Sequence, residues 1–241
     1  PESIKKMIVK DVSDIESVKE GLDFVFSAVD MKKEEIKAIE EAYAKAEVPV
    51  VSNNSAHRWT EDVPMVVPEI NPEHYQLIEK QRKRLGTKRG FIAVKPNCSI
   101  QSYAPAFAAW KEFEPYQAVV STYQAISGAG KNFETWPEMV GNIIPYIGGE
   151  EEKSEKEPLR VLGTYTEEGI KLKEGLVLSA QCIRVPVLNG HTATVSVSFR
   201  KKPTKEELIS ALRNYKGLPQ ERNLPSAPKQ FIQYLEEDNS P

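Results

Sequence analysis

The chain has 241 residues, of which 40% are hydrophobic and 28% are charged, proportions that are ordinary for a globular protein. A chain of this length forms one large domain or two ordinary ones and can bury a substantial core. Its 32 basic and 35 acidic residues give a formal net charge of -3, so it has no basic excess with which to neutralise phosphate groups. We therefore expect neither a nucleic acid nor a membrane as a partner.

Cysteine and histidine are too sparse for a disulfide framework or a zinc site. Cys98 and Cys182 are the two cysteines, and the three histidines are scattered along the chain. We therefore expect no metal site and a reducing, cytoplasmic setting. The chain contains no run of about 18 apolar residues, so we expect no transmembrane helix. The N-terminal residues also lack the apolar region of a signal peptide. The chain also lacks an initiator methionine, so we expect its natural start to lie upstream.

Short apolar runs alternate with helical patterns over the first 95 residues, in the order typical of a parallel α/β sheet. The spacing predicts helices over 31–46 and 74–85, the second stopped by Gly86. The apolar runs predict strands at 22–29, 48–51, 65–67 and 90–94. We interpret residues 1–96 as part of a doubly wound, Rossmann-like domain, which would bind its ligand beyond the carboxyl ends of the strands.

Residues 97–241 differ in character and predict a second, α+β domain with a mixed sheet. Strand composition occupies 116–126, 176–187 and 192–199, and the last of these runs alternates cleanly between small polar and apolar residues. The fold class is therefore α/β in the first part of the chain and α+β in the second.

Helical patterns and turns surround these strands. A helix is predicted over 97–113, with a kink at Pro105, and a capping box opens another over 204–215. Residues 143–158 indicate turns with a charge cluster, and the polar, proline-rich tail over 218–241 indicates loop.

The strongest chemical candidate is Cys98, in the segment PNCS at the junction of a predicted strand and a predicted helix. Asn97 is a favourable N-cap, which would place Cys98 in the first helical turn. Unpaired backbone N–H groups and the positive end of the helix dipole would favour a thiolate there. The alternative is a buried, inert cysteine, which is how most cysteines behave.

Three further candidates follow Cys98 along the chain. Gln124 precedes the segment SGAG at 127–130, whose small residues would let the backbone approach a ligand, although a simple tight turn explains them equally well. Arg184 and His191 flank a short connection and could supply a carboxylate clamp and an acid–base group, although a lone histidine is usually structural or a solvated surface residue.

The remaining polar candidates have ordinary interpretations. The charged run at 150–153 is typical of a solvated surface. His57 and His74 have no evident partners, so we expect both at the surface. Cys182 lies in a strand pattern, where we expect it to pack in the core.

Taken together, these segments resemble aspartate-semialdehyde dehydrogenase, in particular the branch of that family found in archaea, fungi and some bacteria. The matching segments occur in family order and extend over nearly the entire chain. They are FSAVD (26–30), VVSNNSAHR (50–58), VPEINPEH (67–74), PNCS (96–99), YQAISGAG (123–130), NIIPYIGGEEEK (142–153) and RVPVLNGHT (184–192).

The resemblance implies a role for each catalytic candidate. Cys98 matches the nucleophile that attacks the reacting carbon, and Gln124 matches the glutamine that orients the tetrahedral and acyl intermediates. His191 matches the acid–base residue. Arg184 matches the arginine that holds the α-carboxylate of the substrate.

The resemblance also implies binding residues for the substrate and for NADP. Arg58 and Lys153 match basic residues associated with phosphate, and Glu150 matches an acidic partner in substrate recognition. The segments that usually contact the nicotinamide cofactor contain Ser52, Asn53, Ser127 and Gly128.

The activity implied by the resemblance is the NADP-dependent reduction of L-4-aspartyl phosphate to L-aspartate-4-semialdehyde through a cysteine thioester, with release of phosphate. This reaction leads towards lysine, threonine and methionine. Residues 97–241 would form the catalytic and dimerisation domain of a homodimer or homotetramer. The closest alternative is a malonyl-CoA or succinyl-CoA reductase of the same superfamily, and a non-catalytic oligomerisation module is an alternative from another class.

The chain departs from the family pattern at both ends. Family members are longer, open with a glycine-rich loop that cradles the cofactor diphosphate at a helix N-terminus, and continue beyond the position of Pro241. We therefore expect a fragment that binds NADP weakly or not at all and is inactive alone, although Cys98 could still be acylated.

Overall fold

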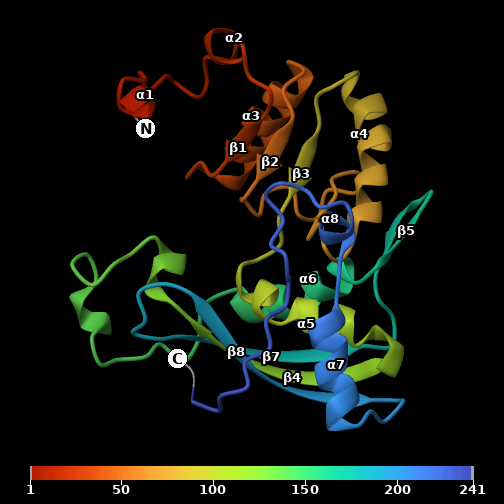
Figure 1. The fold of residues 1–241 in the computed structure, drawn as a ribbon. Coiled ribbons are helices and arrows are strands. Elements are labelled where there is room, and N and C mark those ends of the chain that lie inside the picture. The colour runs from red at the N-terminus through yellow and green to blue at the C-terminus, as the bar shows by residue number, and fades with distance from the viewer. Residues whose placement is uncertain (1, 240–241) are drawn as a thin grey trace. The chain divides into compact units, whose positions relative to one another are not determined.

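A computed structural model describes residues 2–239 of the chain. It divides into two compact units (Figure 1). The first unit comprises Pro1–Met65 and His74–Lys95, and the second comprises Val66–Glu73 and Pro96–Pro241. The mixture of a parallel sheet and a mixed sheet confirms the expected fold class.

The first unit is built on a three-stranded parallel sheet of order β1-β2-β3. Its strands are β1 (Val25–Ser27), β2 (Val50–Ser52) and β3 (Ile92–Val94). Its helices are α1 (Glu2–Lys5), α2 (Ile15–Val18), α3 (Lys33–Lys45) and α4 (Leu77–Leu85), the last preceded by a 3-10 helix over Pro72–Gln76. The register aligns Ser27, Ser52 and Val94, so the three strands end together at one edge of the sheet.

The two longer helices of this unit form where the sequence pattern predicts them. In α3 the buried residues lie at positions i, i+4, i+7 and i+8, the pattern of one helix face: Ile36, Glu40, Tyr43 and Ala44. Helix α4 ends at Gly86, which adopts the left-handed conformation (φ 71°) and donates its N–H to the carbonyl of Arg82 at 2.8 Å. The predicted stop at Gly86 is thus confirmed.

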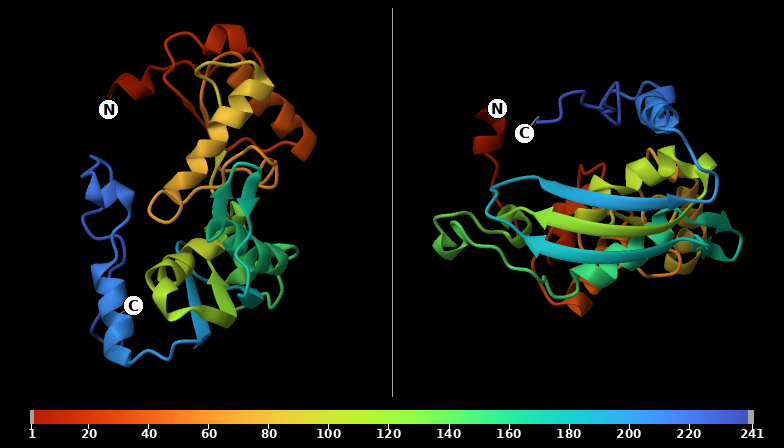
Figure 2. Two further views of the ribbon diagram at one scale, coloured as in Figure 1. Left: turned by 90° about the vertical axis from the view of Figure 1, so that its right-hand side faces the viewer. Right: turned by 90° about the horizontal axis from the view of Figure 1, so that it is seen from below.

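The second unit is built on a mixed sheet of order β7-β4-β8, with β4 in the centre (Figure 2). β4 (Pro115–Gln124) runs parallel to β7 (Val177–Arg184) and antiparallel to β8 (His191–Phe199). A short hairpin of β5 (Thr164–Thr166) and β6 (Gly169–Lys171) lies apart from this sheet.

Helices cover one face of this sheet (Figure 1). Alternate residues of β4 and β7 are buried, and the intervening residues are largely exposed. The α-helices of the unit are α5 (Ala104–Ala109), α6 (Glu150–Val161), α7 (Lys205–Asn214) and α8 (Leu218–Glu221). Its 3-10 helices are Ser99–Ser102, Lys111–Phe113, Ile126–Ala129 and Pro137–Met139.

The pairing of β4 with β8 contains one irregularity. Pro115 pairs with Phe199 and Gln117 with Ser198, so Tyr116 is an extra residue on β4. From Gln117 to Gln124 the register is continuous.

Several sequence predictions about these elements were wrong. The helix expected over 97–113 is broken into 3-10 and α segments, and Pro105 lies in the first turn of α5. The strand expected over 65–67 is reduced to a single bridge between Met65 and Val94. The tail contains the short helix α8 as well as loop.

The turns expected over 143–158 give way to helix α6 from Glu150 onward. Prolines and paired glycines suggested turns, but Gly149 is left-handed (φ 75°) and ends them. Three glutamates in the first turn of α6 then complement the helix dipole, and an ion pair between Glu152 and Lys156 supports the helix one turn later.

The two histidines expected at the surface are buried in the first unit. His57 is 1% exposed and His74 is 0% exposed. Nδ1 of His57 lies 3.0 Å from the Thr60 hydroxyl, a local partner that the sequence spacing did not reveal. Burial lowers the pKa of His57, although the nearby Glu40 acts in the opposite direction.

No helix within residues 2–239 is long and apolar enough to cross a membrane.

Candidate active site

Three predicted site residues lie in one row across the sheet of the second unit. Gln124 ends β4, and its register partners are Arg184, the last residue of β7, and His191, the first residue of β8. A parallel neighbour brings its carboxyl end beside that of β4, whereas an antiparallel neighbour brings its amino end there. Strand pairing therefore gathers three residues that are distant in sequence. Gln124 is buried, and its Nε2 donates to the Thr122 hydroxyl at 3.2 Å.

The thiol of Cys98 contacts this row through His191. Its Sγ atom lies 3.2 Å from Nε2 of the imidazole. On the other side of the ring, Nδ1 accepts the backbone N–H of Ala125 at 3.1 Å. In a neutral ring, an accepting Nδ1 places the proton on Nε2, where it faces the sulfur. The pair can therefore stabilise a thiolate and keep a proton beside it.

The environment of His191 favours its protonated form. The hydrogen bond with the Cys98 sulfur raises the pKa of the imidazole above its ordinary value of 6.5, although burial of the ring acts in the opposite direction. Arg184 also acts to lower the pKa, but the net direction is upward. Protonation places a hydrogen on Nδ1 as well, which replaces the hydrogen bond from Ala125, and the proton on Nε2 beside the sulfur is then the one that can act as a general acid.

Arg184 is a buried cation with unused hydrogen-bonding capacity. It is 6% exposed, and Nη1 donates to the carbonyl of Ala125 at 2.8 Å, the one hydrogen bond that its side chain makes to the described residues. Burial lowers the pKa of Arg184, while the charge of Glu150 acts to raise it. The guanidinium is planar and presents paired donors, so it suits a carboxylate ligand.

The turn at Ser127 and Gly128 packs against Arg184 and His191. A Cβ atom on Gly128 would lie 2.9 Å from Nη1 of Arg184 and 3.1 Å from Nε2 of His191. Glycine at this position is therefore what allows the turn to contact both residues. Ser127 anchors the turn, since its N–H donates to the carbonyl of Leu188 at 3.2 Å.

The surroundings of Cys98 differ from the predicted helix N-terminus. The thiol precedes a 3-10 helix of four residues, Ser99–Ser102, so no long helix dipole acts on it. Oδ1 of Asn97 nonetheless accepts the N–H of Ser99 at 2.8 Å, as an N-cap side chain would. Cys98 itself is exposed, and Cys182 is buried.

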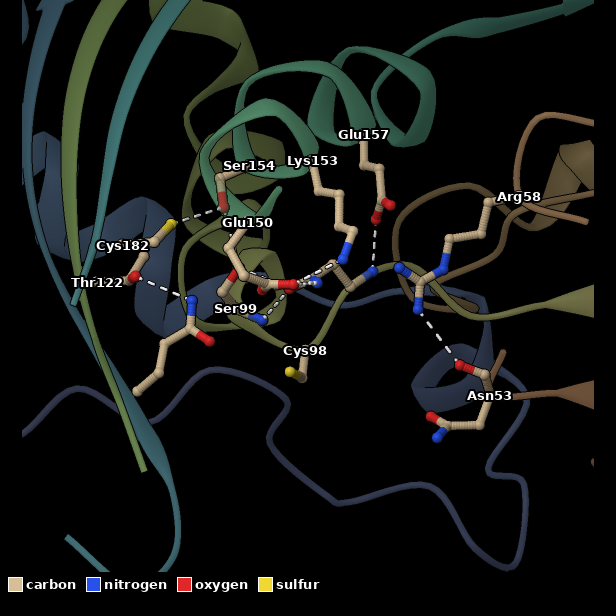
Figure 3. A network of polar contacts seen from close by, with 12 residues as sticks. Asn53, Arg58, Cys98, Ser99, Thr122, Glu150, Lys153, Ser154, Glu157 and Cys182 are labelled. Atoms are coloured by element: carbon tan, nitrogen blue, oxygen red, sulfur yellow. Dashed lines mark hydrogen bonds and ion pairs between the residues drawn. The ribbon is translucent and has the colours of Figure 1, made fainter. Parts of the chain in front are cut away.

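Glu150 and Lys153 lie in the first turns of α6 and are not part of a solvated charge run. The Asn97 amide donates to both carboxylate oxygens of Glu150, at 3.1 and 2.9 Å, and Lys153 donates to the same carboxylate at 2.8 Å (Figure 3). Burial acts to raise the pKa of Glu150, but the hydrogen bond and charge of Lys153, with Asn97 and Gln124, hold it below its ordinary value. Glu150 is thus an ionised carboxylate engaged on two sides.

The other predicted residues belong to the first unit. Ser52 ends β2, and its hydroxyl donates to the buried Glu40 carboxylate at 2.6 Å. Arg58 turns toward Asn53 and donates to its carbonyl at 3.3 Å (Figure 3). Its Nε also donates to the carbonyl of Lys95 at 3.1 Å. These residues gather near the edge where the parallel strands end.

Sequence reasoning missed Ser154 and Glu157, two buried residues of α6 that bond to the segment around Cys98. Their spacing from Glu150, four residues and then three, is the pattern of a single helix face. The expectation of turns in this region concealed that pattern.

Two family profiles match the chain. One is described as "Semialdehyde dehydrogenase, NAD binding domain" and matches residues 1–78. The other is described as "Semialdehyde dehydrogenase, dimerisation domain" and matches residues 104–241.

Curated proteins and solved structures agree with these profiles. The aspartate-semialdehyde dehydrogenase of Aspergillus fumigatus is 39% identical over 225 residues, covering 91% of this chain and 61% of that protein. The aspartate-semialdehyde dehydrogenase of Methanothermobacter thermautotrophicus is 38% identical over 245 residues, covering 100% of this chain and 68% of that protein. A crystal structure of aspartate-semialdehyde dehydrogenase with NADP from Candida albicans matches with a TM-score of 0.85 and 32% identity, covering 100% of this chain and 68% of that one. The chain thus spans 61% to 68% of the length of these relatives.

Proposed function

Because the chain belongs to the aspartate-semialdehyde dehydrogenase family, we propose that the protein reduces L-4-aspartyl phosphate to L-aspartate-4-semialdehyde with NADPH and releases phosphate. The observation that carries this proposal is the pair of Cys98 Sγ and His191 Nε2, 3.2 Å apart, at the row that contains the buried Arg184. A nucleophilic thiol, an acid and a carboxylate anchor are the groups that such a reduction requires.

Cys98 would begin the reaction as the nucleophile. Its thiolate attacks the acyl carbon of aspartyl phosphate, a C–S bond forms, and the C–O bond to the phosphate breaks with its electron pair leaving on phosphate. The product is a thioester on Cys98. Gln124 lies in the row beside His191 and would orient the acyl group through its amide.

His191 would manage the proton of the second step. When bound, NADPH supplies the hydride that takes the thioester carbon to the aldehyde level. As that carbon becomes tetrahedral, its oxygen gains negative charge, which the proton on Nε2 of His191 neutralises. Collapse of the tetrahedral intermediate returns the proton to His191, breaks the C–S bond and releases the semialdehyde with Cys98 again a thiolate.

The substrate carries two anionic groups, which require separate cationic anchors. Arg184 would hold the α-carboxylate, because it is a buried guanidinium with donors to spare. For the phosphate we propose Lys153 and Arg58. Glu150, held ionised by Lys153 and Asn97, would serve as the acidic partner in substrate recognition.

The residues of the first unit fit a dinucleotide. Three parallel strands end in register, and the polar turn that follows Ser52 lies at their carboxyl ends, where sheets of this kind bind ligands. We propose that Ser52 and Asn53 contact NADP there. Ser127 and Gly128, whose turn packs against His191, are the proposed contacts from the second unit.

An assay of the protein as its gene encodes it tests this function. Aspartyl phosphate should drive oxidation of NADPH, and Cys98→Ala should abolish it while the circular dichroism spectrum stays unchanged. Turnover of malonyl-CoA or succinyl-CoA in place of aspartyl phosphate would overturn the substrate assignment. A protein that reduces none of these substrates, yet still self-associates, would be an oligomerisation module.

We further propose a homodimer or homotetramer located in the cytoplasm. The uncovered face of the β7-β4-β8 sheet exposes Val119 (48%) and Val177 (66%), and a second copy would bury such a surface. Cys98 and Cys182 are both present as thiols, in keeping with a reducing compartment. Light scattering on Val177→Lys should show a lower mass than on the unaltered protein, and an unchanged mass would exclude this face.

A further inference from the structure

We propose that Ser154 and Glu157 of α6 are positioning residues that hold the Cys98 thiol at its working distance from His191. The inference rests on the proposed function, because it concerns how the nucleophile of that reaction is held in place. Neither residue is required to touch the substrate. Each acts through the chain segment on one side of the thiol.

One face of α6 forms hydrogen bonds with the segment from Asn97 to Ser99. Oε2 of Glu157 accepts the backbone N–H of Asn97 at 2.5 Å, and the hydroxyl of Ser154 lies 3.0 Å from the hydroxyl of Ser99 (Figure 3). The helix therefore holds the chain one residue before Cys98 and one residue after it. The thiol between them remains exposed and faces His191.

Both side chains are polar and buried, and their burial has a free-energy cost. Glu157 is 1% exposed and Ser154 is 0% exposed. A buried carboxylate or hydroxyl is destabilising unless hydrogen bonds replace its contacts with water. An apolar residue at position 157 would avoid this cost, but it would remove the carboxylate that accepts the backbone N–H of Asn97.

Ser154 is itself fixed from two further directions. Its hydroxyl lies 3.4 Å from Sγ of Cys182 on β7, and its backbone carbonyl accepts the hydroxyl of Tyr103 at 2.8 Å. The α6 face is thus tied to the sheet that carries the catalytic row. Hydrogen bonds through α6 consequently connect the segment around Cys98 to the sheet that carries His191.

The segment needs such support because regular structure does not supply it. Strand β3 has ended at Val94, and the 3-10 helix after Cys98 has only four residues. Loss of a bond to Glu157 or Ser154 would let the segment move relative to His191. A displacement of about 1 Å at a reacting group can lower a rate about 100-fold.

Substitutions at Glu157 and Ser154, compared with a matched control, test the proposal. Glu155 is the control, because Oε1 of this α6 residue also accepts a backbone N–H, that of Ala180 on β7, at 3.1 Å. Glu157→Ala, Glu157→Gln, Ser154→Ala and Glu155→Ala are made in the protein as its gene encodes it. The readouts are the pH profile of Cys98 alkylation by iodoacetamide, kcat and KM with aspartyl phosphate, and Tm.

For Glu157→Ala we expect kcat to fall by about 10- to 100-fold with little change in KM, since the thiol is misplaced while the substrate anchors remain. The midpoint of the alkylation profile should shift to higher pH, because the thiolate loses its donor on His191. Glu157→Gln keeps an acceptor oxygen and should recover most of kcat. Ser154→Ala should cause a smaller shift in the same direction. Glu155→Ala should lower Tm and leave the alkylation midpoint unchanged.

Two results would overturn the proposal: an unaltered midpoint and kcat in folded Glu157→Ala, or an equal shift in Glu155→Ala. If Glu157→Ala does not fold, an unaltered midpoint in Ser154→Ala overturns it instead. Alkylation does not depend on the substrate. An unaltered protein that fails to reduce aspartyl phosphate would refute the proposed function, while a shifted alkylation midpoint would still support positioning.

Discussion

The two partners of the thiol–imidazole pair are held in place by different kinds of interaction. His191 lies in a row that three paired strands fix through their backbones. Cys98 lies in an irregular segment held by side-chain hydrogen bonds from α6. Backbone pairing survives the loss of one side chain, whereas each side-chain bond disappears with one substitution. The thiol side of the site should therefore be the more sensitive of the two to single changes.

The largest effects are expected from removing the reacting groups themselves, which tests whether the two sides form one unit. His191→Ala should lower kcat by about 10²- to 10⁴-fold, the usual contribution of general acid–base catalysis. Cys98→Ala should abolish turnover, and the double variant should be no worse, because the groups act together. Residual turnover in Cys98→Ala that falls further on removing His191 would show that they act independently. The rate of NADPH oxidation is measured for the two single variants and the double variant.

A smaller loss should distinguish the two sides. Asn97→Ala removes the amide that bonds to Glu150 and the oxygen that caps Ser99, and should lower kcat by about 10- to 100-fold. Thr122→Val removes one hydroxyl that bonds to Gln124 in the sheet row and should lower kcat less than about tenfold, since one hydrogen bond contributes about 1 kcal/mol. A larger loss in Thr122→Val would reverse the comparison. Steady-state kinetics on both variants decide it.

Gly128→Ala tests how rigid the sheet side is. Its added methyl group would meet Nη1 of Arg184 and Nε2 of His191, two side chains that hydrogen bonds with the backbone of Ala125 hold in place. We expect kcat to fall about tenfold, because overpacking costs about 1–3 kcal/mol. Gly148→Ala is the control, as its methyl group would meet nothing within 4 Å. Equal kcat and KM in the two variants would show that Arg184 and His191 can move to accommodate the methyl group, and that the sheet side is not rigid.

The smallest effect concerns the ionisation of His191. The bond to the Cys98 sulfur raises its pKa, so Cys98→Ala should lower that pKa. A raised pKa stabilises the folded protein below the ordinary value of 6.5, and this stabilisation is lost as the pH rises through the folded-state pKa. Tm should thus decline across that interval in the unaltered protein, and less so in Cys98→Ala. NMR titration of the ring checks the pKa directly, and identical midpoints would contradict the assignment.

The sheet side of this site could be predicted from sequence far better than the thiol side. The run from Tyr116 to Ile126 and the alternation from Thr192 to Phe199 predict strands by local pattern, and Gln124 and His191 lie at strand ends in the structure. Strand pairing then follows from a small set of rules. The bond between Glu157 and Asn97 joins residues 60 positions apart, and no local pattern predicts it.

The prediction of helices failed where tertiary contacts decide the outcome. Pro145, Gly149 and Pro158 all indicate turns, yet α6 begins directly after Gly149 and includes Pro158. His57 was expected at the surface because its partners, Thr60 and the carbonyl of Lys37, become visible only once the chain is folded. In both cases, packing of the surroundings outweighs the local preference.

Because of the extra residue Tyr116, one end of the sheet should accept insertions and deletions more readily than the other. It lies at the end of β4 remote from Gln124, and its ring stacks under the guanidinium of Arg200 at 5.0 Å. Insertions or deletions near Phe199 can be taken up at this bulge, where pairing is already irregular. A residue inserted between Val119 and Gln124 would instead turn Gln124 to the opposite face. Loop grafting and natural length variation should therefore be confined to the remote end.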